Sequence, residues 1–131
     1  MNIGQAADAC GISAKRIRYY EQVGLIDSAK RTGAGYRVYD ARDLHTLSFI
    51  RRSRQLGFSL EEIATLLGLW RDQHRSSADV RRVAAKHIED MRAKIAELQA
   101  MVDTLENLVG CCDGDERPDC PILEDLQRIE P

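Results

Sequence analysis

The apolar residues between positions 77 and 109 repeat with a heptad period. They stand alternately four and three residues apart, at Ala84, Ile88, Met91, Ile95, Leu98, Val102, Leu105 and Val109. This a/d pattern predicts one long helix, residues 77–109, with a narrow apolar seam. About 33 helical residues at 1.5 Å each span roughly 50 Å, which is too long for a small domain to cover. We therefore expect the seam to pack against a second copy of the chain as a dimerising coiled coil.

The pattern near the start of the chain predicts two short helices joined by a glycine turn. The first, residues 3–9, has one apolar face and stops before Gly11, which suits a left-handed cap. Ser13 can cap the second, which ends at Gly24. A helix, a turn and a basic helix over about residues 4–23 indicate a helix-turn-helix, although a small helical hairpin with a charged face fits the same pattern. The basic residues of the second helix are Lys15, Arg16 and Arg18.

Residues 30–39 predict a basic β-hairpin. Two glycines, Gly33 and Gly35, stand inside a basic frame, and an alternating run that typifies a strand follows them. A basic hairpin after a helix-turn-helix is a wing, whose Arg and Tyr side chains can bond DNA phosphates without reading sequence.

Two further helices are predicted by their start signals. Asp40 is followed by Asp43 and Ser59 by Glu62, and each pair has capping-box spacing. Their apolar residues are expected to close the core of this N-terminal part, at Leu44, Leu47, Ile50, Leu60, Ile63, Leu66 and Leu67. Three arginines at the end of the first of these helices either extend the basic face or are solvated surface residues: Arg51, Arg52 and Arg54.

The net charge of -2 conceals an asymmetry between the two parts of the chain. Residues 1–75 contain twelve Lys or Arg and eight Asp or Glu, whereas residues 76–131 contain seven and thirteen. The N-terminal part therefore carries +4 and the C-terminal part -6. This difference favours a polyanion-binding face on the N-terminal part, and a solvated charged surface is the alternative.

The sequence contains no apolar run long enough for a membrane span and no secretory signal near Met1. We therefore expect a cytoplasmic protein with no membrane partner, whose four cysteines are reduced thiols. Cys10 is expected in the core, while Cys111, Cys112 and Cys120 cluster after the long helix. A short helix, residues 122–129, is expected to follow Pro121.

Three motifs at matching separations resemble the MerR family of transcription regulators. They are Arg18-Tyr19-Tyr20-Glu21 with Gly24-Leu25, Gly35-Tyr36-Arg37-Val38-Tyr39, and the run from Gly57 to Ile63. The resemblance implies a mainly α fold: a winged helix-turn-helix DNA-binding domain (1–70), an antiparallel coiled-coil dimerisation helix (77–109) and a metal-binding loop with a short helix (111–131). The resemblance implies six DNA-contacting residues: Lys15, Arg18, Tyr20, Arg31, Tyr36 and Arg37. The basic pattern of the second helix adds Arg16 as a seventh candidate.

The tail resembles the copper-responsive CueR or HmrR branch of this family. The resemblance implies Cys112 and Cys120 as metal ligands and Ser77 of the partner subunit beside them. Sensors of divalent metals resemble one another in having a cysteine at the position of Ser77, so serine here implies copper(I), silver(I) or gold(I), one ion per loop. Two soft thiolates suit such ions, whereas zinc prefers four ligands. A divalent-metal site stays possible, because the loop also contains four carboxylates that could complete a zinc shell: Asp113, Asp115, Glu116 and Asp119.

The implied function is that of a homodimeric activator, not an enzyme. It would bend and untwist an overlong promoter so that RNA polymerase meets both recognition elements of copper efflux genes. Two alternatives stay open: a redox sensor with a Cys112–Cys120 disulfide, and a coiled-coil adaptor or small enzyme whose N-terminal part is merely basic. In an antiparallel dimer the heptad register pairs residues whose numbers sum to roughly 189, which places Ser77 beside Cys112 of the partner subunit.

Overall fold

The computed structural model describes residues 1–27, 30–111, 114–116 and 118–129. It divides into two compact units, Met1–Ala84 and Ala85–Pro131, and each is considered by itself. The first unit contains α1 (Ile3–Cys10), α2 (Ala14–Gln22), β1 (Lys30–Arg31), β2 (Arg37–Val38), α3 (Ala41–Gln55) and α4 (Leu60–Arg71). The helix α5 (Ser77–Cys111) runs from the first unit into the second, which also contains α6 (Pro121–Leu126). The predicted mainly helical fold is confirmed.

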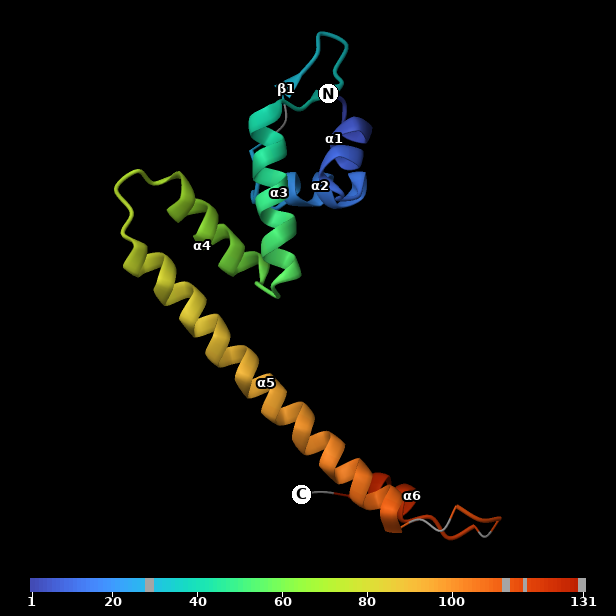
Figure 1. The fold of residues 1–131 in the computed structure, drawn as a ribbon. Helices are drawn as coiled ribbons and strands as arrows, with labels where there is room; N and C mark the ends of the chain where they lie inside the picture. Colours follow the sequence, from blue (N-terminus) through green and yellow to red (C-terminus); the bar gives the residue numbers. More distant parts are fainter. Residues whose placement is uncertain (28–29, 112–113, 117, 130–131) are drawn as a thin grey trace. The chain divides into compact units, whose positions relative to one another are not determined.

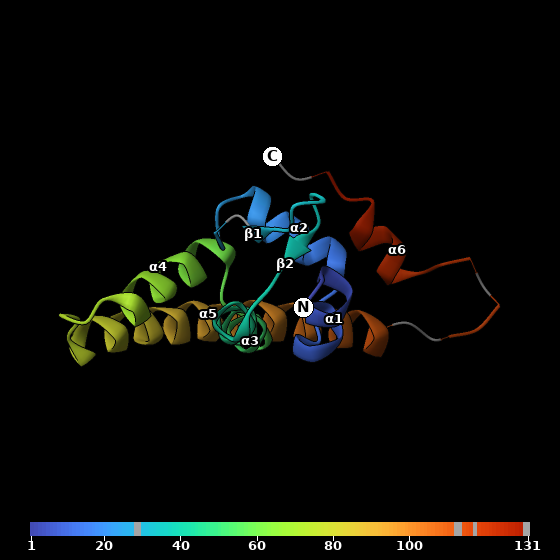
Figure 2. The same ribbon diagram turned by 90° about the horizontal axis from the view of Figure 1, so that it is seen from above.

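In the first unit α3 is the central helix, with α1 on one side of it and α4 on the other (Figures 1 and 2). Its core residues Leu47 and Ile50 are fully buried, as are Ile17 of α2 and Ile63 of α4. Leu44, Leu60 and Leu66 pack against this cluster as half-buried residues. The predicted core is therefore confirmed, because one apolar stripe on each helix converges on α3. The remaining buried hydrophobic residues are Ala6, Cys10, Ile12, Tyr20, Leu25, Ile26, Tyr39, Phe58 and Leu67.

Local hydrogen bonds set the helix starts where the sequence predicts them. The Asp40 carboxylate accepts from the Asp43 backbone N–H at 3.0 Å, and Asp43 accepts in return from the Asp40 N–H at 3.0 Å. Ser59 and Glu62 form the same reciprocal box at α4. Each box satisfies backbone donors that the first helical turn leaves unpaired. A third box, between Asn2 and Gln5 at α1, was not predicted.

The predicted wing is a short antiparallel hairpin in which Lys30 pairs with Val38 and Arg31 with Arg37. Its turn is closed by the Thr32 N–H, which donates to the Tyr36 carbonyl oxygen at 2.8 Å. Gly35 has a φ of 86°, a left-handed conformation. Glycine adopts this conformation at the lowest free-energy cost because it has no Cβ. The glycines predicted to punctuate the basic frame therefore form the tip of the wing.

The long helix α5 begins at the predicted Ser77 and extends two residues beyond the predicted Val109. At 1.5 Å per residue its 35 residues measure about 52 Å. The seam residues from Ile88 to Val109 are 43–63% exposed in the single chain. An apolar stripe of this length is unusual on a free surface. The described helices are all too short or too polar to span a lipid bilayer.

The short C-terminal helix ends earlier than predicted. The sequence predicts residues 122–129, whereas α6 spans Pro121–Leu126 and Gln127 closes it, with its N–H facing the carbonyls of Leu123 and Asp125. Pro121 occupies the first turn, where a missing N–H costs nothing. The helix has no buried residue among those described, and a helix this short has little intrinsic stability beyond one turn.

Candidate nucleic-acid interface and thiol site

The second helix, α2, presents a basic exposed edge. Ser13 caps it, with its Oγ accepting from the Arg16 N–H at 3.2 Å. Lys15, Arg16 and Arg18 are all exposed in its first half. The apolar side of α2 is anchored by Ile17, which is fully buried. The helix-turn-helix layout thus leaves the predicted basic residues accessible to a polyanion.

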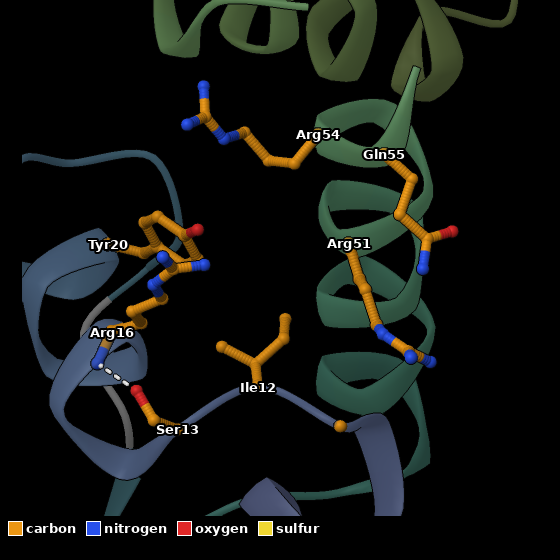
Figure 3. A pocket seen from close by; sticks show the side chains of 8 residues that line it. Ile12, Ser13, Arg16, Tyr20, Arg51, Arg54 and Gln55 are labelled. Carbon is orange, nitrogen blue, oxygen red and sulfur yellow. Dashed lines mark hydrogen bonds between the residues drawn. The ribbon is translucent and has the colours of Figure 1, made fainter. Parts of the chain in front are cut away.

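The predicted contact Tyr20 is a buried residue of α2. Its side chain is 5% exposed and belongs to the core cluster. Figure 3 shows its hydroxyl directed toward a hollow beside the helix-turn-helix. The ring therefore supports the fold, and a DNA contact by Tyr20 stays a prediction that concerns its hydroxyl alone.

The wing places its three predicted contacts in different environments. Tyr36 at the tip is 72% exposed, and Arg31 is exposed while its guanidinium donates to the Gly35 carbonyl at 3.1 Å. Arg37 is half-buried, because its Nε donates to Oε2 of Glu21 at 3.0 Å. This ion pair joins β2 to α2, so Arg37 orients the wing relative to the basic helix. The direct DNA contacts of the three residues stay predictions.

Glu21 is a residue whose role the sequence did not indicate. Its side chain is 9% exposed, and its partner Arg37 lies sixteen positions away on another element. Tyr39 lies in the same environment: burial first, and the negative charge of Glu21 second, raise the pKa of its phenol. Among the described residues its hydroxyl is a buried polar group with no hydrogen-bond partner. No periodic or capping pattern predicts such a tertiary pairing.

A basic hollow of about 380 Å³ opens between the α1–α2 turn, α2 and α3. Figure 3 shows Arg16 and Tyr20 on the α2 side, and Arg51, Arg54 and Gln55 projecting from α3 on the other. Two of the three arginines that were candidates for the basic face thus line the hollow, whereas Arg52 is exposed and does not line it. The complete lining is Gly11, Ile12, Ser13, Arg16, Tyr20, Arg51, Arg54 and Gln55.

The structure describes only part of the predicted thiol site. Cys120 is half-buried immediately before α6, and its side chain makes no capping hydrogen bond, so its sulfur is not committed to the helix. Cys111 is the exposed last residue of α5, and Cys10 is buried as predicted. Cys112 lies outside the described residues. Within the described ranges no three His, Cys, Asp or Glu side chains gather closely enough to hold a metal ion.

Ser77 is the exposed first residue of α5. The capping role that a serine could play there belongs to its neighbour, because Ser76 Oγ accepts from the Asp79 N–H at 3.2 Å. The hydroxyl of Ser77 is therefore not needed to start the helix.

Comparison with known proteins identifies the family. The description "MerR HTH family regulatory protein" matches residues 1–69, and "MerR, DNA binding" matches residues 44–108. The heavy metal-dependent transcription regulator 2 of Rhizobium meliloti (strain 1021) is 56% identical over 96% of this chain and 86% of its own length. The regulator CueR of Escherichia coli O157:H7 is 41% identical over 96% of this chain and 93% of its own length.

A solved structure has the same fold over nearly the whole chain. The transcription regulator PbrR691 from Ralstonia metallidurans CH34, in complex with lead(II), is 32% identical with a TM-score of 0.85. The similarity covers 96% of this chain and 98% of that chain. The winged helix-turn-helix, the long helix and the matched sequence agree, and the chain belongs to the MerR family of DNA-binding transcription regulators, which are not enzymes.

Proposed function

We propose that the protein is a copper(I)-responsive activator of the MerR family, with silver(I) and gold(I) as alternative effectors. The observation that carries this proposal is a pair of thiols, Cys112 and Cys120, eight positions apart in a chain otherwise similar to CueR and to a heavy metal-dependent regulator. The target genes would encode copper efflux or detoxification proteins, and the protein would act in the cytoplasm.

The donor atoms fit a soft monovalent ion. Thiolate sulfur prefers copper(I) to hard cations, and the Cys120 sulfur is not used to cap α6. The three histidines stand at 45, 74 and 87, outside the 111–131 segment, and His87 is buried in α5. Cys112 and Cys120 would hold the ion through their thiolate sulfurs, and the bound ion would link the two cysteines. One ion per loop gives two per dimer.

A divalent-metal sensor is the second candidate. It is favoured by the likeness to PbrR691, whose structure is described as a complex with lead(II), and by the carboxylates of Asp115, Glu116 and Asp119. Ser77 favours the monovalent reading, because the divalent sensors that this family includes resemble one another in having a cysteine there. Since Ser76 caps α5, helix capping does not account for Ser77.

A homodimer would complete the site. The exposed seam of α5 is the expected contact between two antiparallel copies, since its heptad spacing suits knobs-into-holes packing. In the register predicted above, Ser77 of one chain approaches Cys112 of the partner subunit. The metal loop of one chain would then lie beside the start of α5 in the partner subunit, where that helix leaves the partner's DNA-binding domain.

On DNA, the two basic α2 helices would enter successive major grooves while the wings contact the flanking backbone. The metal-bound dimer would bend and untwist the promoter so that RNA polymerase engages both elements, which is control through DNA deformation. Metal and distorted DNA would then be linked ligands, each changing the affinity of the other.

Cysteine substitutions in the reduced protein test this function. We expect Cys112→Ser and Cys120→Ser each to abolish copper-activated transcription in vitro while operator binding is retained. Cys111→Ser is the matched control and should respond like the wild type. A response that persists in Cys120→Ser would contradict the ligand assignment, and a response that requires oxidation instead of copper would favour a Cys112–Cys120 disulfide sensor.

A further inference from the structure

The basic hollow concentrates positive charge. Three arginines line it, Arg16, Arg51 and Arg54, and no Asp or Glu belongs to its lining. Within the described part of the chain, none of the three forms an ion pair with a carboxylate. Like charges converging on one concave surface raise the local potential and attract an anion.

Two of these arginines are held in place by the fold. A Cβ at Gly11, whose φ is 71°, would lie 3.0 Å from the Cζ of Arg51, so the glycine provides the room in which this guanidinium lies. Arg54 donates to the Phe58 carbonyl oxygen at 3.2 Å, which fixes its side chain at the end of α3. These positions reduce the entropy that ligand binding would otherwise cost.

The start of α2 adds to the same potential. Ser13 caps this nine-residue helix and Arg16 lies in its first turn, and both residues line the hollow. The helix dipole makes a helix start favourable for phosphate, although the Arg16 N–H itself is already bonded to Ser13 Oγ. The hollow therefore combines three arginines with the start of a helix. Arg guanidinium groups can bind phosphate in bidentate geometry.

We propose that this hollow binds one backbone phosphodiester of the DNA duplex, at a position beside the groove that α2 enters. The contact is continuous with the exposed Lys15 and Arg18 of α2, so a duplex that meets this helix also brings its phosphates to the hollow. It positions the protein without reading bases. The proposal rests on the DNA binding of the proposed function and adds Arg51 and Arg54 as positioning residues.

Charge-removing substitutions on α3 give a matched comparison. Arg51→Gln should weaken operator binding by the full-length dimer about three- to tenfold at moderate salt, because each of the two chains loses one phosphate contact. Arg52→Gln removes the same charge from the next residue, which is exposed but does not line the hollow, and should change the affinity less than about twofold. Arg54→Gln should resemble Arg51→Gln, with thermal unfolding recorded because its bond to Phe58 is also lost.

The salt dependence separates a phosphate contact from a general charge effect. For Arg51→Gln, the slope of log affinity against log salt should fall by about 1.8, which is about 0.9 for each of the two phosphates that the two chains of the dimer contact on B-DNA. The slope for Arg52→Gln should stay at the wild-type value. The loss should be equal on operator and on unrelated duplex DNA, since the contact reads no base.

A double-mutant cycle identifies the phosphate itself. Single methylphosphonate linkages are placed along the operator backbone, and each is measured with wild type and with Arg51→Gln. One linkage should weaken wild-type binding yet cost the variant nothing further, because both changes remove the same contact. Strict additivity at every linkage would overturn the proposal.

Other anions would give different results. If Arg51→Gln binds DNA as the wild type does but loses an inorganic phosphate site seen by NMR titration, the hollow holds a free anion and the proposal is wrong. If its DNA affinity is unchanged but activated transcription by RNA polymerase falls, the hollow faces an acidic protein surface and the proposal is again wrong. A wild-type dimer that binds no duplex DNA would refute the proposed function itself, whereas the other contrary outcomes refute only the hollow.

Discussion

At the scale of single residues, the ion pair between Glu21 and Arg37 connects the basic helix α2 to the wing. The Nε–Oε2 distance is 3.0 Å, and the two side chains are only 9% and 27% exposed. Because the pair is largely shielded from water, removing one partner leaves the other charge poorly solvated. The wing is therefore held to α2 by a charge-assisted bond and not by its two-residue strands alone.

Arg37→Gln should reduce the free energy of unfolding by about 1–3 kcal/mol, because the shielded, charge-assisted bond between Arg37 and Glu21 is lost. Urea unfolding at a fixed protomer concentration measures this, since the stability of a protein that dimerises depends on its concentration. Arg31→Gln, an exposed wing arginine, is the control and should lower DNA affinity while the stability changes little. Equal stability of Arg37→Gln and wild type would show that the pair does not secure the wing.

The cap of α3 should make stability dependent on acidity. The bond from the Asp43 backbone N–H, more than any other contact, lowers the pKa of the Asp40 carboxyl below its ordinary value. A carboxylate with a lowered pKa stabilises the fold at pH values above its unfolded pKa of about 4, and this contribution is lost as the pH falls through the lower folded value.

Asp40→Asn keeps a capping side chain that does not titrate. Wild type should therefore lose stability relative to this variant between about pH 5 and pH 2, while the two stay nearly parallel above pH 5. Thermal unfolding across this range checks the expectation. A constant difference from pH 7 to pH 2 would mean that Asp40 does not contribute through its charge.

At the scale of elements, helix starts and stops were predictable because they depend on neighbours in sequence. Ser13, Asp40 and Ser59 cap the helices they precede, and Gly11 and Gly57 take left-handed conformations just past helix ends. The long helix was predictable for a different reason, since its heptad period persists over the whole element.

Tertiary features escaped prediction because no local rule governs them. The burial of Tyr20 depends on the assembly of the whole core cluster, and the Glu21–Arg37 pair depends on where the wing folds back. For the candidate site, the exposed basic residues of α2 were predictable from composition, but the hollow that Arg16 and Arg51 both line required α3 to be in place. The early end of α6 follows from its lack of buried contacts, which the sequence pattern does not report.

The seam of α5 makes an element-scale prediction about assembly. Leu98→Asp places a charge at a seam position that is 60% exposed in the single chain, and it should convert the dimer to monomer. Ala100→Asp places the same charge on the opposite face of the helix and should leave a dimer. Sedimentation velocity distinguishes the two, and a dimeric Leu98→Asp protein would show that the seam is not the dimer contact.

At the scale of the whole molecule, charge and chemistry separate along the chain. The basic residues gather in the first 75 positions, where α2 and the wing lie, and the acidic excess and three of the four thiols lie beyond them. A dimer through α5 would give two DNA-binding domains and two thiol loops in one particle. The predicted register makes each loop a neighbour of the helix that leads from the other domain, which is a physical route from metal binding to DNA shape.

Metal binding to the strictly reduced dimer tests the central claim most directly. Copper(I), zinc(II) and lead(II) are titrated against competing chelators, and X-ray absorption reports the coordination of the bound ion. The account predicts one copper(I) per chain held by two sulfurs, lost in Cys112→Ser and Cys120→Ser, and bound far more tightly than either divalent ion. Tighter binding of zinc(II) or lead(II) with a larger ligand set, or no copper(I) binding under strict reduction, would contradict it.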